Sequence, residues 1–362
     1  MPIVSFLLIG IFSVSVLKDS VFADRNGGGV YVGKNSIFNM TRGTLSGFNI
    51  SGNGGAVYVS EGGTFNMTAG SIYGNTATLG GNNIYNAGTF TMTGGKIGKQ
   101  MLTHVDESGN KDKNGNYVYF GSYPQTLKES NITIDENDVD DKGYFLGSDG
   151  ERYLKLTAHA PYYGDIIYNF SDGSTITVGS TYYFKVEPIK WKIVKESEGK
   201  LTLYAESVLD QTVWSSSNGL NYKESTVREF INGTFYNTAF AANEKNLIQT
   251  TEVDNSASSL ETGDDALACE NTNDKVFLFS IADVYLSTGF LGYTSSEQRK
   301  KVPTDYARAS GLYMESTIDE NKNNAMYWTR SPSSNNIANM AYDVSYSGEY
   351  SHGGVSANLG VA

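Results

Sequence analysis

The residues best suited to molecular recognition lie near the C-terminus, where tyrosines are spaced among short polar residues. Tyr342, Tyr346 and Tyr350 recur every four positions among Ser, Asn and Gly. Tyrosine offers a large contact area at low conformational entropy, and Ser, Gly and Asn add adaptable hydrogen bonding, as in antibody paratopes. Aromatic faces beside Asn and Asp equally suit sugar rings. We therefore expect an exposed ligand-binding face at about 327–362, with candidate residues Asn335, Asn336, Asn339, Tyr342, Asp343, Tyr346, Tyr350 and His352.

An anchor precedes this polar segment, in the sequence "YWTRSP" that begins at Tyr327. We expect Trp328 to be a core aromatic residue. Arg330 should form a buried ion pair or bind main-chain carbonyls, because its guanidinium presents five donors in a fixed geometry. The alternative is a polar, flexible C-terminus, but the interspersed apolar residues indicate a fixed segment: Ile337, Met340, Val344 and Val355.

Catalytic and metal-binding patterns are missing from the sequence. Cys269 is the only cysteine and lies in the acidic segment 263–274, where neighbouring carboxylates oppose thiolate formation. His104, His159 and His352 are scattered and lack metal-ligand spacing. No nucleophile elbow, phosphate-binding glycine loop or zinc-protease helix is found. We expect no enzyme activity, no metal and no cofactor.

The composition favours turn-rich β-structure and excludes one class of partner. The chain has 40 Gly, 25 Tyr and only 6 Pro among 362 residues, and 18% of its residues are charged. Its formal net charge of −12 has the wrong sign for binding the phosphate backbone of nucleic acids. We therefore expect no nucleic-acid partner.

An internal repeat occupies the first part of the chain. "GGGVYV" begins at Gly27, "GGAVYV" at Gly54 and "GGNNIYN" at Gly80, which gives periods of 27 and 26 residues. Each unit continues with "FNM" or "FTM" and then with a second Gly-containing corner. Three short β-segments per repeat predict the coils of a right-handed parallel β-helix, with Val30, Val32, Phe38 and Met40 pointing into the core.

The repeats are too poor in charged residues to form a catalytic site. Between Gly27 and Gly98 the charged residues are Lys34, Arg42, Glu61 and Lys96. A lyase or glycosidase needs clustered acids and bases, which one carboxylate cannot provide. The repeats resemble the Gly-rich coils of bacterial surface adhesins, and this resemblance implies a spacer or stalk.

The domain organisation follows from these patterns and from the N-terminus. Residues 1–23 have an apolar core and a small-residue cleavage site, as in a secretory signal peptide, and the apolar run is too short for a confident transmembrane span. We expect a signal peptide at 1–23, a repeat stalk at 24–98, a linker at 99–116 and a second domain at 117–362. A buried N-terminal helix or a membrane tether is the alternative for residues 1–23. The protein should be secreted or displayed on the cell surface, without an integral membrane span.

The second domain has mixed α+β patterns. The stretch 189–206 reads as a β-hairpin with its turn at "ESEG" (196–199). Ser225 is a candidate N-cap for a helix within 225–240. We predict a buried strand leading into a short helix at 274–286, and a helical turn at 303–313 that ends at Gly311.

The second domain also carries a family resemblance. The ordered set "YVYFGSYPQT", "PIKWKIV", "STVREFINGTFYNTAF", "DKVFLFSIADV", "PTDYARASG" and "YWTRSP" resembles a domain of gut-bacterial secreted proteins that has no assigned function. That domain is grouped with the formylglycine-generating-enzyme and C-type-lectin-like folds. The resemblance implies a C-type-lectin-like domain over 117–362 whose last strands present an exposed face. The enzyme's cysteine pair does not carry over, because Cys269 stands alone.

These expectations combine into one function with an alternative. We expect an adhesin-like binding protein whose C-terminal face recognises a glycan or a protein on a host or neighbouring cell. The residue types of the tail also match those produced by adenine-directed mutagenesis of Asn codons in retroelement-diversified proteins of this fold. The alternative is a structural module of a cell-surface assembly that self-associates through the tail and has no soluble ligand.

Overall fold

The computed structural model divides the chain into two compact units. One comprises Met1–Met101 with Ala242–Ile248, and the other comprises Leu102–Ala241 with Gln249–Ala362. We call residues 26–98 the repeat unit and the second body the C-terminal unit, and we describe each by itself. The structure describes residues 26–98, 102, 104–112, 114–161, 168–197, 200–217, 219–245, 247–260, 267–286, 289–314, 323–333 and 339–362. The predicted signal peptide lies outside these residues.

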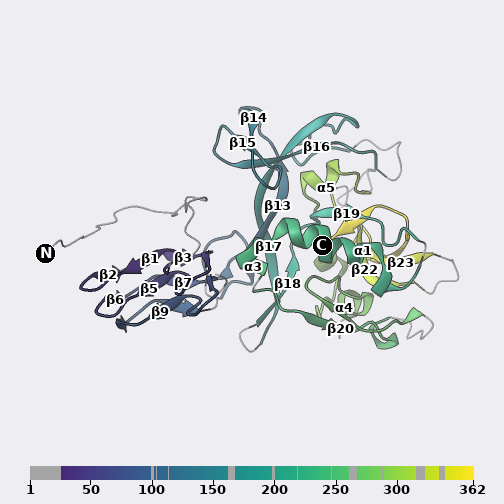
Figure 1. The fold of residues 1–362 in the computed structure, drawn as a ribbon. Coiled ribbons are helices and arrows are strands. Elements are labelled where there is room, and N and C mark those ends of the chain that lie inside the picture. Colours follow the sequence, from purple (N-terminus) through teal and green to yellow (C-terminus); the bar gives the residue numbers. More distant parts are fainter. Residues whose placement is uncertain are drawn as a thin grey trace. The chain divides into compact units, whose positions relative to one another are not determined.

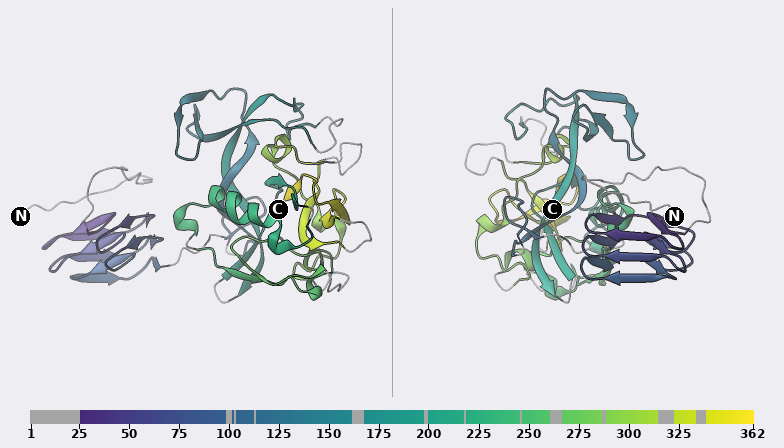
Figure 2. Two further views of the ribbon diagram at one scale, coloured as in Figure 1. Left: turned by 45° about the vertical axis from the view of Figure 1, so that its right-hand side comes forward. Right: turned by 90° about the vertical axis from the view of Figure 1, so that its left-hand side faces the viewer.

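Parallel β-sheets form the repeat unit, and their strands stack as rungs (Figure 2). Short three-residue and four-residue strands recur in each repeat, because Gly and polar corners interrupt every run of β-formers. Three sheets have the orders β1-β5-β9, β2-β6-β10 and β3-β7-β11, and β4 pairs with β8. Their bounds are β1 (Val30–Val32), β2 (Ile37–Met40), β3 (Thr44–Ser46), β4 (Asn49–Ile50), β5 (Val57–Val59), β6 (Thr64–Met67), β7 (Ser71–Tyr73), β8 (Thr76–Ala77), β9 (Ile84–Asn86), β10 (Thr89–Met92) and β11 (Lys96–Gly98).

The register corrects the predicted period of the third repeat. Residues of the first and second repeats pair at an offset of 27, as in Val30 with Val57. The second and third repeats pair at 27 for Val57 with Ile84 but at 25 for Phe65 with Phe90. A four-residue corner (60–63) separates β5 from β6, whereas a two-residue corner (87–88) separates β9 from β10. The predicted period of 26 between the second and third repeats is therefore wrong as a single offset, because the third repeat loses two residues at one corner.

The predicted inward-facing residues do build the core of the repeat unit. Val32 and Met40 are buried, and Val30 and Phe38 pack against the same cluster. The middle repeat is the best covered, because it has a neighbour on each side. Its core side chains are fully buried, namely Ala56, Val57, Val59, Phe65, Met67 and Ile72.

Aromatic ladders follow the strands of the repeat unit. Tyr31 stacks on Tyr58 at 5.2 Å between ring centroids, and Tyr58 stacks on Tyr85 at the same spacing. Phe65 stacks between Phe38 and Phe90. Equivalent side chains meet in this way because parallel in-register pairing sets repeat next to repeat.

A seven-stranded antiparallel sheet dominates the first half of the C-terminal unit (Figure 1). Its long central strand β17 pairs with β13 and β16, and with β18 as the predicted hairpin. The bounds are β12 (His104–Val105), β13 (Tyr117–Leu127), β14 (Ile134–Val139), β15 (Phe145–Gly147), β16 (Arg152–Thr157), β17 (Thr181–Ser197) and β18 (Lys200–Ala205).

The predicted linker at 99–116 is in part a piece of this sheet. His104 pairs with Val118, and Val105 pairs with Tyr117, so that β12 extends the sheet from its edge. Val105 is 5% exposed and the Lys190 ammonium donates to the carbonyl of Glu107. The polar sequence hid this strand, because an edge strand needs few apolar residues.

The second sheet holds the C-terminal segment. Its strand order is β19-β25-β22-β23-β24, with β25 parallel to β22. The bounds are β19 (Asp210–Thr212), β22 (Tyr327–Pro332), β23 (Met340–Val344), β24 (Tyr350–Gly354) and β25 (Leu359–Val361). A small antiparallel pair is formed by β20 (Thr251–Val253) and β21 (Thr272–Asp274). The strands described within the tail are therefore part of this sheet.

Short helices join these sheets. The predicted Ser225 cap is confirmed, because its hydroxyl accepts from the Arg228 N–H at the start of α1. Gly311 follows α5 with a φ of +97°, as expected for the residue that ends the predicted helical turn. The helices are α1 (Thr226–Phe230), a π-helical turn (Ile231–Phe235), α2 (Tyr236–Ala239), α3 (Ala242–Lys245), α4 (Ile281–Tyr285) and α5 (Asp305–Ala309), with short 3-10 turns at Tyr222–Glu224, Ala257–Ser259 and Ser296–Arg299.

The buried strand predicted at the start of 274–286 is wrong except for Asp274 in β21. Residues 275–280 belong to no strand, because side chains satisfy their backbone groups in place of a ladder. The Asn232 side chain bonds the N–H and C=O of Val276, and the Arg330 guanidinium donates to the Leu278 carbonyl. No helix in the described part of the chain is long and apolar enough to cross a membrane.

Candidate functional site

The tail hairpin gathers aromatic side chains from both of its strands. In the antiparallel pair β23–β24, Tyr342 lies opposite His352 and Val344 lies opposite Tyr350. The ring centroids of Tyr342 and His352 are 4.6 Å apart, and the Tyr350 ring packs edge-on against Tyr285 of α4 at 4.6 Å. The predicted residues Tyr342, Tyr350 and His352 therefore do come together, joined by Tyr285, which the sequence did not single out.

Exposure divides the predicted binding residues. Asn339 is exposed with a φ of +66°, Tyr350 is 39% exposed, and Tyr346 and His352 are half-buried. Tyr342 is only 3% exposed and Asp343 has no exposed surface. The exposed positions predicted for Tyr342 and Asp343 are wrong, because hydrophobic clusters cover both faces of β23, one of them containing Val344 and the other Ala341. Asn335 and Asn336 lie outside the described residues.

Asp343 is a buried carboxyl group without a compensating charge. Among the described residues, neither of its side-chain oxygens has a hydrogen-bond partner of good geometry. Burial raises the pKa of Asp343 to about 8, and the nearby Gly353 N–H lowers that pKa only slightly. The group is therefore mostly a neutral acid at pH 7, consistent with a core position.

Arg330 is held by both kinds of partner that the sequence predicted. Its Nη1 donates to Asp283 Oδ2 at 2.9 Å and to the Leu278 carbonyl at 3.0 Å. Its Nε and Nη2 donate to the Asp254 carbonyl at 3.2 and 3.0 Å. Trp328 is 2% exposed, and its Nε1 donates to the Thr212 carbonyl at 2.9 Å. The anchor is confirmed, and it fixes β22 to α4 and to the segment after β20.

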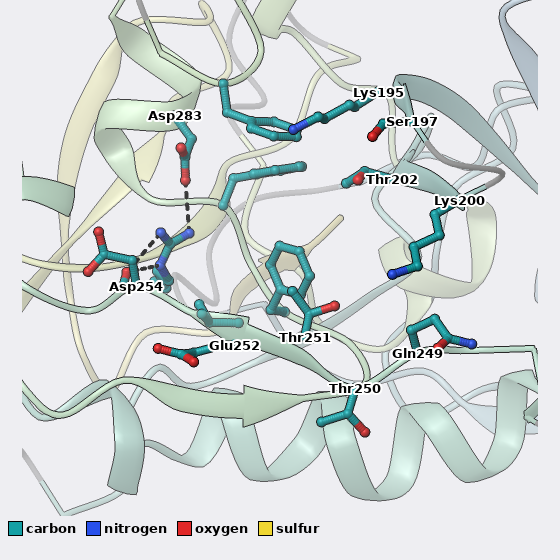
Figure 3. Close-up of a pocket in the computed structure, with 15 residues that line it drawn as sticks. Lys195, Ser197, Lys200, Thr202, Gln249, Thr250, Thr251, Glu252, Asp254 and Asp283 are labelled. Carbon is teal, nitrogen blue, oxygen red and sulfur yellow. Dashed lines mark hydrogen bonds and ion pairs between the residues drawn. The ribbon is translucent and has the colours of Figure 1, made fainter.

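Arg330 also lines a groove that the sequence did not predict. The groove has a volume of about 510 Å³, within the range of small-molecule sites, and it is open to solvent. It runs between the β17–β18 hairpin, β20 and the segments on both sides of α4 (Figure 3). The lining residues are Lys195, Ser197, Lys200, Thr202, Gln249, Thr250, Thr251, Glu252, Val253, Asp254, Phe277, Phe279, Asp283, Phe290 and Arg330.

Three phenylalanines give the groove an apolar floor. Phe279 is buried and stacks on Phe290 at 5.5 Å, and Phe277 packs edge-on against Phe279 at 5.8 Å. Phe290 remains 40% exposed, so part of its ring is free to contact a ligand. Five separate chain segments build this site, and none carries a motif, so no local sequence signal marked it.

Two buried titratable groups with strongly shifted pKa values, Asp210 and Lys301, lie away from the groove. Asp210 accepts a hydrogen bond of 2.5 Å from the Tyr123 hydroxyl, and burial raises the pKa of Asp210 to about 6. Burial lowers the pKa of Lys301 to about 7, and its ammonium lies 3.8 Å from the Tyr204 ring centre. Within the described ranges, no group of three His, Cys, Asp or Glu side chains could hold a metal ion.

Comparison with known proteins finds one partial match, to a family model without an assigned role. A family model described as a domain of unknown function (DUF6273) matches residues 198–362, which include β18, most of the groove and the whole tail. The match begins after β17, so it covers only part of the C-terminal unit. A search of curated proteins finds no match, and a search of solved structures finds none either.

Proposed function

We propose that this chain is a secreted or surface-displayed, adhesin-like binding protein of a bacterium. The repeat unit would be a parallel β-helix that serves as a stalk, and the C-terminal unit would be a C-type-lectin-like domain that recognises a glycan or a protein. The observation that carries the proposal is the open groove with a phenylalanine floor and polar walls, built on the Arg330–Asp283 ion pair. An apolar floor with a few polar groups is typical of small-molecule binding sites.

The contrast in charge between the two units supports separate roles. The repeat unit has four charged residues between Gly27 and Gly98, and its aromatic ladders repeat without a cluster of acids and bases. The carboxyl groups of Asp210 and Asp343, whose pKa values are raised, are not among the residues that line the groove. We therefore propose recognition and no catalysis.

Retroelement-driven diversification remains part of this proposal. If the tail is diversified, variation should concentrate at exposed positions such as Asn339 and Tyr350. Tyr342 and Asp343 lie in the core, where most replacements would destabilise the sheet. A second copy of the 3′ end of the gene that differs only at adenines would support diversification, and variation centred on the two core positions would contradict it.

A structural module of a surface assembly is the second candidate function. It is favoured by large apolar side chains exposed on the repeat unit, including Tyr31 at 59%, Ile37 at 64% and Leu79 at 71%. Exposed apolar side chains on short parallel strands can support contacts between copies.

One experiment separates the two functions. Labelled full-length chain is titrated onto host epithelial cells and onto other bacteria, and its sedimentation is measured over the same concentration range. Saturable binding by a monomer supports the binding function, and loss of that binding after enzymatic deglycosylation or after protease treatment of the cells tells glycan from protein. Self-assembly without saturable binding to any surface would overturn it and favour the structural module.

A further inference from the structure

The electrostatics of the groove define the ligand class further, and this step rests on the proposed binding function. The acidic groups of the groove already have partners. Asp283 pairs with Arg330, and Glu252 accepts from the Asn271 amide at 3.0 Å. The Asp254 carboxylate accepts from the Ser256 N–H at 2.9 Å, and the side chain and N–H of Ser256 together lower the pKa of Asp254. These groups are therefore poorly placed to bind an additional cation.

The two lysines on the opposite wall have no such partner. In the ranges that the structure describes, no carboxylate forms an ion pair with Lys195 or Lys200, although the chain has a net charge of −12. The contact shown by Lys195 is with the face of Phe290, at 5.7 Å from its ammonium to the ring centre. In Figure 3 both lysines lie across the groove from Glu252, Asp254 and Asp283. The groove is therefore cationic on one wall.

An exposed apolar ring and threonine hydroxyl groups also line the groove. The Phe290 ring is 40% exposed and supported from behind by Phe279. Thr202 and Thr251 line the same groove. An exposed aromatic face can pack against the C–H face of a sugar ring, and threonine hydroxyls can both donate to and accept from sugar hydroxyls.

We propose that this groove binds a carboxylated sugar, such as a uronic acid unit of an acidic glycan. Its carboxylate would lie between Lys195 and Lys200, its ring would pack on Phe290, and its hydroxyls would meet Thr202 and Thr251. A free carboxylate complements two ammonium groups that no carboxylate of the described residues neutralises, whereas a neutral sugar offers them no counter-charge. The ligand is thus selected by charge and by ring stacking together.

Trigalacturonic acid is the probe, and its fully methyl-esterified form is the matched neutral control with the same rings. We expect calorimetry on the full-length chain to show binding of the acid and at least tenfold weaker binding of the ester. The double variant Lys195→Gln/Lys200→Gln should lose at least tenfold in affinity for the acid. Phe290→Ala should also weaken binding, and 3′-sialyllactose against lactose provides a second pair of acidic and neutral probes.

A second double variant, Lys34→Gln/Lys111→Gln, removes the same net charge at exposed positions outside the groove and should bind like the wild type. An equal loss in both double variants would show that only the overall charge matters and would overturn the proposal. Equal binding of acid and ester, or no heat with either acidic probe, would overturn it as well. Cell binding that persists unchanged in the groove variants would leave the binding function standing and refute this site.

Discussion

The buried Arg330 and the half-buried Asp283 form an ion pair that organises three parts of the C-terminal unit at once. The guanidinium Nη1 lies 2.9 Å from Asp283 Oδ2, and the same carboxylate oxygen accepts from the N–H and the hydroxyl of Ser280, the capping residue of α4. The guanidinium also binds the carbonyls of Asp254 and Leu278. One side chain of β22 thereby fixes the start of α4 and the wall of the groove.

Replacement of Arg330 by Met should destabilise the C-terminal unit by about 3–5 kcal/mol, because it leaves the Asp283 carboxylate without its charge partner. Urea unfolding followed by tryptophan fluorescence measures the change in the free energy of unfolding.

Arg152→Met is the matched control. Arg152 pairs with Asp138 at 2.8 Å, but both side chains are more than a third exposed, at 35% and 43%. Its loss should change the free energy of unfolding by no more than about 1 kcal/mol. Similar decreases in the free energy of unfolding of the two variants would show that the Arg330–Asp283 pair stabilises the fold no more than an exposed pair does.

Asp343 should make stability depend on pH. Its pKa is about 8 in the folded chain, against about 3.9 when unfolded, so the folded state keeps a proton that the unfolded state releases. The contribution of the protonated Asp343 to the free energy of unfolding is fully present below pH 4. It decreases as the pH rises toward 8, by at most about 1.4 kcal/mol per pH unit.

Asp343→Asn removes this titration while it keeps the shape of the side chain. The variant should match the wild type near pH 4 and become more stable than it by a few kcal/mol near pH 8. Chemical unfolding at pH 4, 6 and 8 measures the difference, with the exposed Asp141→Asn as control. A stability difference between Asp343→Asn and wild type that does not change with pH would contradict the raised pKa.

Local patterns were enough to predict much of the fold. Val32 and Met40 point inward as the alternation predicted, because short parallel strands with Gly corners leave one face for the core. The β17–β18 hairpin and the Ser225 cap also depend on neighbouring residues alone. The partners of Arg330 were predictable in kind, since a guanidinium in a core needs carboxylate or carbonyl acceptors.

Features that depend on distant contacts were not predictable in this way. Tyr342 and Asp343 look like surface residues by type, but core clusters built from distant segments pack on both faces of β23. The groove unites Lys195, Thr251 and Phe290 from segments that are far apart in the chain. The Asn232 side chain bonds the backbone N–H and C=O of Val276, where a strand had been predicted to form hydrogen bonds with a neighbouring strand. The local sequence pattern does not reveal this distant contact.

Close packing between repeats should make Gly55 irreplaceable. A Cβ at this position would lie 1.9 Å from the Asn82 carbonyl oxygen, and the Gly55 N–H donates to the Gly81 carbonyl at 3.0 Å. Gly55→Ala must push the third repeat away, so we expect the free energy of unfolding of the repeat unit to fall by about 3 kcal/mol or more. Hydrogen exchange of the repeat unit should rise across β5 and β9.

Gly33→Ala is the matched control in the same unit. Its nearest atom would be a Tyr31 ring carbon at 3.7 Å, an ordinary contact, so the free energy of unfolding should change by no more than about 1 kcal/mol. Equal exchange in the two variants would show that the repeats are not packed against one another at Gly55.

The tail hairpin separates a structural tyrosine from an exposed one, and this gives a direct test of which surface binds. Tyr342 is 3% exposed, and Tyr342→Ala should destabilise the unit by about 3–5 kcal/mol, because it leaves a cavity beside His352. Tyr350 is 39% exposed, and Tyr350→Ala should keep the fold while it lowers the free energy of unfolding by about 1 kcal/mol. Thermal unfolding of both variants checks this order.

Binding to cells by the folded Tyr350→Ala variant then distinguishes the tail from the groove. If the tail face contacts the ligand, removal of an exposed aromatic residue should weaken binding by at least tenfold. If the groove alone binds, Tyr350→Ala should match the wild type while Phe290→Ala loses affinity, because the two rings belong to different contact clusters. Losses in both variants would indicate one ligand that spans both surfaces, since each variant removes a single exposed ring.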